Sequence, residues 1–195
     1  MRKIILAIVG LVVVTASLLY FRWQERQNYA RTERMGHGLG INCLNNLMQI
    51  SLTFRIWNGD HGNQFPFNTS TNAGGTLELC APDKDGFDSN AFLFIQAMSN
   101  ELSTVNILIC PKDPSKKPAA NWASVTASNI TYRFRSGTNI TVSGPREVLA
   151  VCPIDGNILY SDGTIKSKYP IKPDDSGQIP MRVTLPDNTN VHSAK

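Results

Sequence analysis

The hydrophobic pattern of the chain begins with an uncharged run from Ile4 to Phe21, in which Thr15 and Ser17 are the polar residues. Because a helix rises about 1.5 Å per residue, this run covers roughly 27 Å, close to the ~30 Å hydrocarbon core of a bilayer. The pattern therefore predicts a single-pass transmembrane helix within residues 1–21. The residues expected to mark this membrane anchor are Ile4, Leu11, Leu18 and Phe21.

A cleaved secretory signal is the alternative interpretation of the same run. Arg2 and Lys3 form a short basic start, and Val14-Thr15-Ala16 offers small residues before a cleavage after Ala16. Orientation is ambiguous as well, because four arginines follow the run and the positive-inside rule counts them against Arg2 and Lys3. The pattern thus favours an anchor and leaves its direction open.

After the anchor, residues 22–40 are expected to form a polar, basic juxtamembrane helix that leads into a neck with Gly36, Gly38 and Gly40. Each glycine in a helix interior costs about 1 kcal/mol relative to alanine, so this cluster predicts a break, kink or flexible neck. Apolar residues then recur at three- and four-residue steps, which predicts an amphipathic helix that ends at Asn58-Gly59. The residues of its apolar face are Leu44, Leu47, Met48, Leu52, Phe54 and Trp57.

The rest of the chain predicts a second helix and several short strands. Asp88-Ser89-Asn90 precedes apolar positions from Ala91 to Leu102, as expected for a capped amphipathic helix of about three turns. Asp162-Gly163 predicts a type I′ hairpin turn. The strand candidates are 106–110, 130–134, 147–151, 157–161 and 164–168. The fold class is therefore α+β, with one head over residues 41–170 and a loose C-terminal tail at 171–195.

The distribution of charge argues against nucleic acid as a partner. The formal net charge is +4, but the first 34 residues hold six basic and two acidic side chains, and the remainder holds 13 of each. A neutral body beside a basic juxtamembrane segment suits an anionic lipid surface, whereas a nucleic-acid-binding face needs basic groups on the folded body. We therefore expect membrane lipid as a partner and no nucleic acid.

The titratable residues do not form a recognisable catalytic constellation. His37, His61 and His192 fall in the glycine-rich neck, a turn and the tail, without the spacing of metal ligands. No nucleophile motif such as Gly-x-Ser-x-Gly accompanies them. We expect no catalytic residue, no cofactor and no enzymatic activity.

Oxygen-bearing side chains cluster in the turn after the first helix, at Asn58, Asp60, Asn63 and Gln64. Such ligands suit calcium, which takes six to eight oxygens, but the same residue types are favoured at any helix terminus and turn, and the loop pattern of an EF-hand is missing. We expect no metal site, and Asp60 and Asn63 are the calcium candidates that remain.

Four cysteines are present, at Cys43, Cys80, Cys110 and Cys152. They are even in number and lack the close pairs typical of a zinc site, which agrees with disulfides in an oxidising compartment. Four buried free thiols would explain them equally well. Cys-Pro occurs twice, at Cys110-Pro111 and Cys152-Pro153.

Several stretches resemble a known family: CLNNLMQISLTFRIWNGDHGNQFPF at 43–67, GGTLE and AFLFIQAMSNELSTVNILICPKD within 74–113, NITYRF at 129–134 and VCPIDGNILYSDGTI at 151–165. They are similar to the prepilin-type, major-pseudopilin-like proteins of planctomycete and verrucomicrobial bacteria. The resemblance implies a pilin-like head in the periplasm, an N-terminal helix in the bacterial inner membrane, and a structural role in a type II secretion or type IV pilus-like system. It also implies contacts with other pilin-like or secretion-system subunits through that helix, and no catalysis.

The N-terminus departs from the prepilin pattern. If Gly10 took the place of the cleavage glycine, the fifth residue after it would be Thr15, where prepilins carry a glutamate. A carboxylate within the membrane needs a partner and so can fix the register of assembling helices. The sequence therefore predicts a permanently anchored relative of pseudopilins. The alternative is a tethered or secreted binding module that recognises a ligand through its loops.

Overall fold

The computed structural model describes residues 2–167 and 183–184, and it has an α+β fold. Two compact units can be separated, Met1–Gly38 and Leu39–Lys195, and each is described here by itself. The main elements are α1 (Arg2–Asp60), α2 (Ala91–Ala97), β1 (Arg133–Phe134), β2 (Val148–Val151), β3 (Ile158–Tyr160), β4 (Ile165–Lys166) and β5 (Val183–Thr184). Short 3-10 helices join them: η1 (Pro66–Asn68), η2 (Thr71–Ala73), η3 (Leu77–Leu79), η4 (Val105–Leu108), η5 (Trp122–Ser124) and η6 (Ala127–Asn129).

The first unit consists of helix α1 up to Gly38. Its described side chains are nearly all exposed, including a run of large apolar residues. These exposed apolar residues are Val13, Val14, Leu18, Leu19, Tyr20, Phe21 and Trp23. No helix among the residues that the structure describes is long and apolar enough to cross a membrane.

The expected break at the glycine cluster is wrong, because α1 continues through Gly36, Gly38 and Gly40 without interruption. None of the three takes a positive φ, so none adopts the backbone conformation for which glycine is specially suited. Helix propensity is a weak preference that flanking structure overrides, and here the residues that follow are held by a packed core. Gly40 is already buried.

Alanine substitution tests the continuity of the helix. A Cβ built at Gly36 or Gly38 meets no atom within 4 Å, so Gly36→Ala and Gly38→Ala should each favour the helix by about 0.5–1 kcal/mol. Far-UV circular dichroism of the full-length chain should show higher helical content and a later loss of helix on heating. Gly62→Ala is the control, because Gly62 has φ +63° and alanine is strained there. A loss of helix in the first two variants would contradict a continuous α1.

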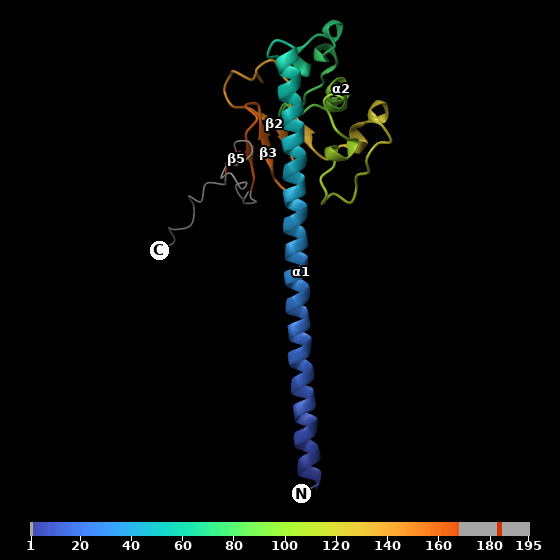
Figure 1. Ribbon diagram of the computed structural model, residues 1–195, viewed down its shortest axis with the longest axis vertical. Coiled ribbons are helices and arrows are strands. Elements are labelled where there is room, and N and C mark those ends of the chain that lie inside the picture. Colours follow the sequence, from blue (N-terminus) through green and yellow to red (C-terminus); the bar gives the residue numbers. More distant parts are fainter. Residues whose placement is uncertain (1, 168–182, 185–195) are drawn as a thin grey trace, which may run out of the picture. The chain divides into compact units, whose positions relative to one another are not determined.

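The head, which we define as residues 39–167 of the second unit, is built around the C-terminal part of α1 (Figure 1). The buried apolar side chains of this part are Cys43, Leu44, Leu47, Ile50, Phe54 and Trp57. This confirms the predicted amphipathic helix, with one exception. Leu52 is 49% exposed, because a turn of about 100° per residue places it roughly 160° from Phe54 around the helix.

Phe54 lies at the centre of the core. Its ring contacts those of Phe65, Phe67, Phe94 and Phe134, at centroid separations of 5.7, 6.4, 6.3 and 6.2 Å. These rings come from the loop after α1, from η1, from α2 and from β1, and all are at most 1% exposed. One aromatic side chain of α1 therefore contacts three other segments of the head, because Phe65 is the N-cap residue of η1 and forms one segment with Phe67.

The sheet has the order β1-β2-β3-β4-β5, and its first four strands are antiparallel neighbours. The register shifts between Val148 and Ala150, which marks a bulge in β2. The small antiparallel sheet is thus confirmed. β5 adds a parallel pairing with β4, with Ile165 opposite Val183. β5 falls within the expected loose tail at 171–195, and the rest of that tail lies outside the described residues.

The turn between β3 and β4 differs from the predicted type I′ hairpin. Gly163 has φ +83°, but Asp162 does not take the positive φ that a type I′ turn also requires. The N–H of Gly163 donates to Tyr160 O at 3.0 Å, and the N–H of Tyr160 donates to Thr164 O at 2.9 Å. The loop therefore has three residues. Asp162 Oδ1 instead accepts hydrogen bonds from Thr164 N and Oγ1, which fixes the turn.

Two further expectations were wrong. The stretch 106–110 does not form a strand, because η4 covers Val105–Leu108, where Thr104 caps the turn by accepting a hydrogen bond from Asn106 N. Helix α2 is shorter than three turns and ends at Ala97, followed by a turn in which Ser99 N donates to Gln96 O. Local hydrogen bonds in turns therefore take the place of the expected strand at 106–110 and of the expected last turns of α2.

Candidate functional site

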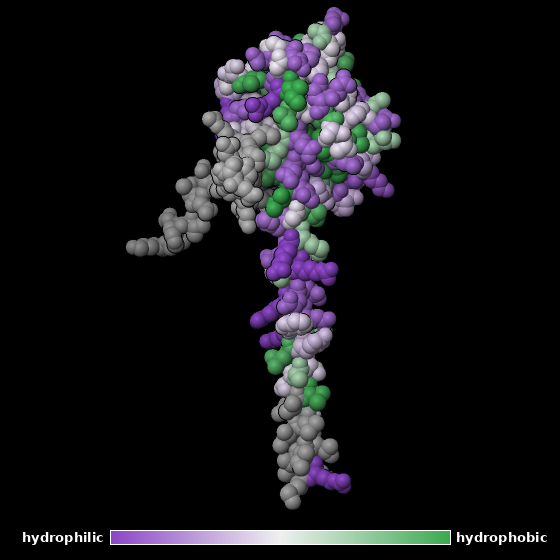
Figure 2. All heavy atoms as spheres, in the orientation of Figure 1, coloured by the Kyte–Doolittle hydropathy of each residue, from purple (hydrophilic) through white to green (hydrophobic). Residues whose placement is uncertain are grey.

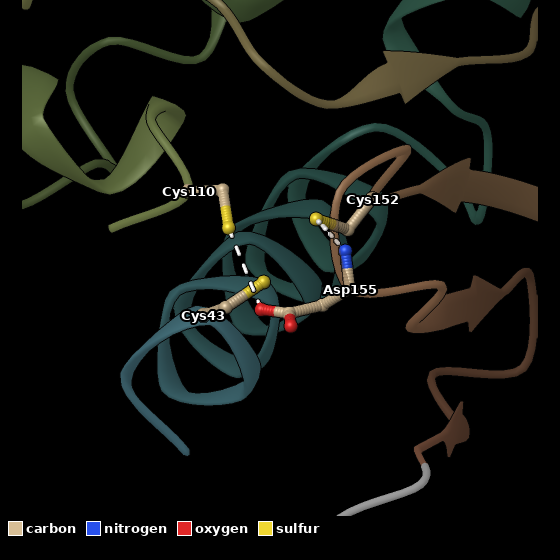
Figure 3. A group of neighbouring side chains, drawn as sticks. All are labelled: Cys43, Cys110, Cys152 and Asp155. Carbon is tan, nitrogen blue, oxygen red and sulfur yellow. Dashed lines mark hydrogen bonds between the residues drawn. The ribbon is translucent and has the colours of Figure 1, made fainter. Parts of the chain in front are cut away.

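Three of the four cysteines meet in the interior of the head. Cys43 comes from α1, Cys110 follows η4, and Cys152 follows β2; each is fully buried. Their sulfurs and a carboxylate oxygen of Asp155 all lie within 4.8 Å of one another (Figure 3). All three cysteines are free thiols. We call Cys43, Cys110, Cys152 and Asp155 the cysteine–aspartate cluster.

Polar side chains hold Cys43 in place. Tyr132 Oη lies 3.6 Å from Cys43 Sγ and 3.4 Å from its carbonyl oxygen. Asn157 Nδ2 donates to Cys43 Sγ at 3.5 Å, while Asn157 Oδ1 accepts a hydrogen bond from Ser167 Oγ at 2.8 Å. Cys43 therefore sits among hydrogen-bonding groups, although it lies on the apolar face of α1.

Each of the other two cysteines begins a Cys-Pro turn. In the turn at Cys152, the backbone N–H of Asp155 donates to Cys152 Sγ at 3.3 Å, and Gly156 N donates to Cys152 O at 2.8 Å. In the turn at Cys110, Asp113 N donates to Cys110 O at 2.8 Å, and the backbone N–H of Lys112 is directed at the Cys110 sulfur. Both turns thus point backbone N–H groups at sulfur, which stabilises negative charge there.

Asp155 completes the cluster and has a cationic neighbour. Its side chain is 1% exposed, and Oδ1 forms an ion pair with Lys112 Nζ at 2.7 Å. Its Oδ2 accepts a hydrogen bond from Cys110 Sγ at 3.5 Å. Since a buried carboxylate needs charge compensation, the Lys112 ammonium is a fitting partner for Asp155 at this position.

The three thiols differ in their pKa values because they hydrogen-bond to one another. Hydrogen bonds from Cys110 and Cys43, together with backbone N–H groups, lower the pKa of the Cys152 thiol. Hydrogen bonding to Cys152 raises the pKa of Cys110 to about 12. Hydrogen bonds with Cys110 and Cys152, and burial, raise the pKa of Cys43. Within the cluster the pKa of Cys152 is therefore lowered, whereas those of Cys43 and Cys110 are raised.

Cys80 is not part of this cluster. Its Sγ lies 3.2 Å from Thr76 O, and burial raises the pKa of this thiol to about 11. It is a free thiol like the others. The cysteines proposed from the sequence as disulfide partners thus divide into three that converge and one that does not.

Among the described residues, the other candidate ligands that the sequence indicated lie outside the cysteine–aspartate cluster. Asp60 and Asn63 are exposed where α1 ends, and Asn63 has φ 62° and donates its N–H to Asn58 O. His61 stacks on Trp57 at 3.7 Å between ring centroids. His37 is exposed on α1, and His192 lies outside the described residues.

The sequence analysis did not identify Asp155, and it did not predict that the cysteines converge. The repeated Cys-Pro was the available signal, because each copy begins a turn that carries an aspartate three residues later, Asp113 or Asp155. Only the fold distinguishes them: Asp155 turns into the cluster, whereas Asp113 accepts hydrogen bonds from Ser115 and Thr131.

No protein-family model, curated protein or solved structure matches this chain.

Proposed function

We propose that this chain is a non-enzymatic, membrane-anchored, pseudopilin-like structural protein. In this proposal residues 4–21 form a single-pass anchor in the bacterial inner membrane, and the pilin-like head faces the periplasm. The protein serves as an assembly component of a type II secretion or type IV pilus-like system. Other pilin-like subunits contact it through the N-terminal helix.

The observation that carries this proposal is the ring of exposed apolar side chains on α1. Leu18, Leu19, Tyr20 and Phe21 are consecutive and 61 to 69% exposed. Because successive residues turn by about 100°, these four side chains point to all sides of the helix. A helix that is apolar on every side needs apolar surroundings on every side, as lipid or neighbouring transmembrane helices supply. In the sequence, the uncharged run that ends at Phe21 begins at Ile4.

The surface of the head seen in Figure 2, in contrast to that of residues 18–21 of α1, is mainly hydrophilic. Most apolar side chains of the C-terminal part of α1 are buried, with Leu52 and Ile56 among the exposed exceptions. A helix whose second part supports an α+β head and whose first part is apolar on all sides has the organisation expected of a pilin-like subunit. This organisation supports an extracytoplasmic head on a membrane helix.

Membrane extraction tests the anchor. Full-length protein should remain in the membrane fraction through high-salt and alkaline washes and should dissolve in detergent. Leu11→Arg, at the middle of the uncharged run, should reduce insertion, because an arginine at a bilayer centre costs about 2.5–3.5 kcal/mol. Met35→Arg is the matched control, because Met35 is exposed on the same helix outside the run.

Three outcomes distinguish the interpretations. Retention of the unaltered chain and of Met35→Arg, with loss of Leu11→Arg, supports the anchor. Release of the unaltered chain by salt alone would contradict it and would assign membrane contact to the arginines. A soluble chain whose intact mass corresponds to cleavage near Ala16 would make the protein a secreted one.

A binding module is the second candidate function, because the head has a groove of about 590 Å³ beside α1. Amide side chains line much of it, at Asn42, Asn45, Asn46 and Gln49 on α1 and Asn106 on η4. Amides both donate and accept hydrogen bonds, which suits a polar ligand such as a peptide or a sugar. Ligand capture that is lost in Asn45→Ala, with membrane retention unchanged, would favour this function.

A further inference from the structure

We propose that Cys43, Cys110, Cys152 and Asp155 bind one structural zinc ion inside the head. This inference does not depend on the proposed function, because it concerns the interior of the head alone. It goes against the sequence expectation of no metal site, and against the interpretation of the cysteines as disulfide partners, which relied on the lack of close cysteine pairs.

The separation of the ligand atoms fits a single tetrahedral ion. With zinc–sulfur bonds of about 2.3 Å, the sulfurs around one zinc ion are about 3.8 Å apart. In the cluster all four ligand atoms lie within 4.8 Å of one another. Shifts of about 1 Å or less therefore convert the cluster into a coordination sphere, and three sulfurs with one carboxylate oxygen are ligand types that zinc accepts.

The surroundings of the ligands also match those of a metal site. The backbone N–H of Asp155 on Cys152 Sγ, and that of Lys112 toward Cys110, stabilise thiolates. Asn157 donates to Cys43 Sγ. Lys112 Nζ pairs with Asp155 Oδ1 at 2.7 Å, while Asp155 Oδ2 lies on the side of Cys110, 3.5 Å from its sulfur. Such outer hydrogen bonds orient metal ligands and reduce the excess negative charge of the site.

The burial of the cluster indicates a structural ion and not a catalytic one. The three cysteines are 0% exposed and Asp155 is 4% exposed, so four protein ligands would close the coordination sphere. Catalytic zinc sites keep a position open for water or substrate, whereas structural sites do not. On binding, the ion forms bonds to three sulfurs, and the protons of the protonated thiols leave to solvent without any change in oxidation state.

A disulfide is the competing outcome for the same residues. Three cysteines permit one disulfide and leave the third sulfur beside a buried carboxylate, whereas one ion engages all four groups together. The ligands also come from three segments far apart in the chain, so the ion stabilises the folded head specifically. Zinc should therefore raise the melting temperature.

The test uses untagged full-length protein, reduced and stripped of metal with a chelator. Co²⁺ should bind at one ion per chain and give the visible absorption of tetrahedral cobalt with thiolate ligands, and Zn²⁺ should abolish that absorption. Cys43→Ser and Asp155→Asn should each weaken binding by about 10- to 100-fold or more, the range seen when even outer ligands of metal sites are lost. Cys80→Ser is the matched control, because Cys80 lies outside the cluster.

A second measurement guards against variants that fail to fold. Zn²⁺ should raise the melting temperature of the reduced, unaltered chain and of Cys80→Ser equally. The proposal is overturned if the reduced chain binds no Co²⁺, or if binding is unchanged in Cys43→Ser and Asp155→Asn. It is also overturned if freshly purified native protein contains a disulfide between two of the three clustered cysteines, as shown by intact mass after alkylation.

Discussion

Phe54→Ala should lower the free energy of unfolding of the head by about 3–5 kcal/mol, the range for truncating a buried phenylalanine. Phe54 is 1% exposed, and its ring contacts four others from three different segments. Truncation removes the ring contacts with all of them and leaves a cavity. The surrounding rings cannot close this cavity without moving α2 and β1, so structural relaxation should recover little of the lost free energy of unfolding.

Chemical denaturation of the full-length chain, followed by tryptophan fluorescence, measures this effect. Leu52→Ala is the control, because Leu52 is two residues away on the same helix and 49% exposed. It should change stability by about 0.5 kcal/mol or less. Equal effects of the two substitutions would show that the head is not built around the inward face of α1.

Asp88→Ala should destabilise the head by about 2–4 kcal/mol, because it leaves three hydrogen-bond donors without their acceptor, including the buried hydroxyl of Ser136. Asp88 Oδ1 accepts hydrogen bonds from Ala81 N and Asn90 N at 3.0 and 2.7 Å, and Oδ2 accepts one from Ser136 Oγ at 2.6 Å. Its own N–H donates to Phe134 O at 2.8 Å. One carboxylate therefore ties the loop before α2 to the end of β1.

Thermal melting monitored by circular dichroism measures the loss of stability in Asp88→Ala. Asp85→Ala is the matched control, since Asp85 is an exposed aspartate in the same loop. Asp88→Asn should be intermediate, because the amide keeps one acceptor and turns an N–H₂ group toward existing donors. An Asp88→Ala variant as stable as Asp85→Ala would contradict the role of this carboxylate.

The sequence predicted those elements whose pattern is local. The apolar spacing from Leu44 to Trp57 and the turn residues around 157–166 were sufficient to predict the core helix and the hairpin of β3 and β4. Propensity alone misled at Gly36 and Gly38, where neighbouring helix outweighs a cost of about 1 kcal/mol per glycine. At 106–110 an apolar stretch looked like a strand, although Thr104 caps a 3-10 turn there.

The cysteine–aspartate cluster could not be predicted in the same way. Its members are separated along the chain by the whole of α2 and by β1 and β2, so no spacing in the sequence reveals their meeting. Proximity arises only when α1 packs under the loops that follow η4 and β2. The similar Cys-Pro turns at Cys110 and Cys152 indicate a shared local conformation, but not that both sulfurs point to one place.

The contacts of α1 also determine when the head can fold during synthesis. Asn157 contacts Cys43 across 114 residues, and Ser51 Oγ donates to Gly163 O across 112. Native structure with such distant contacts forms slowly, because long loops must close before the contacts form. The apolar face of α1 therefore emerges long before the sheet that covers it. Until β4 has been synthesised, this apolar face is uncovered and open to aggregation.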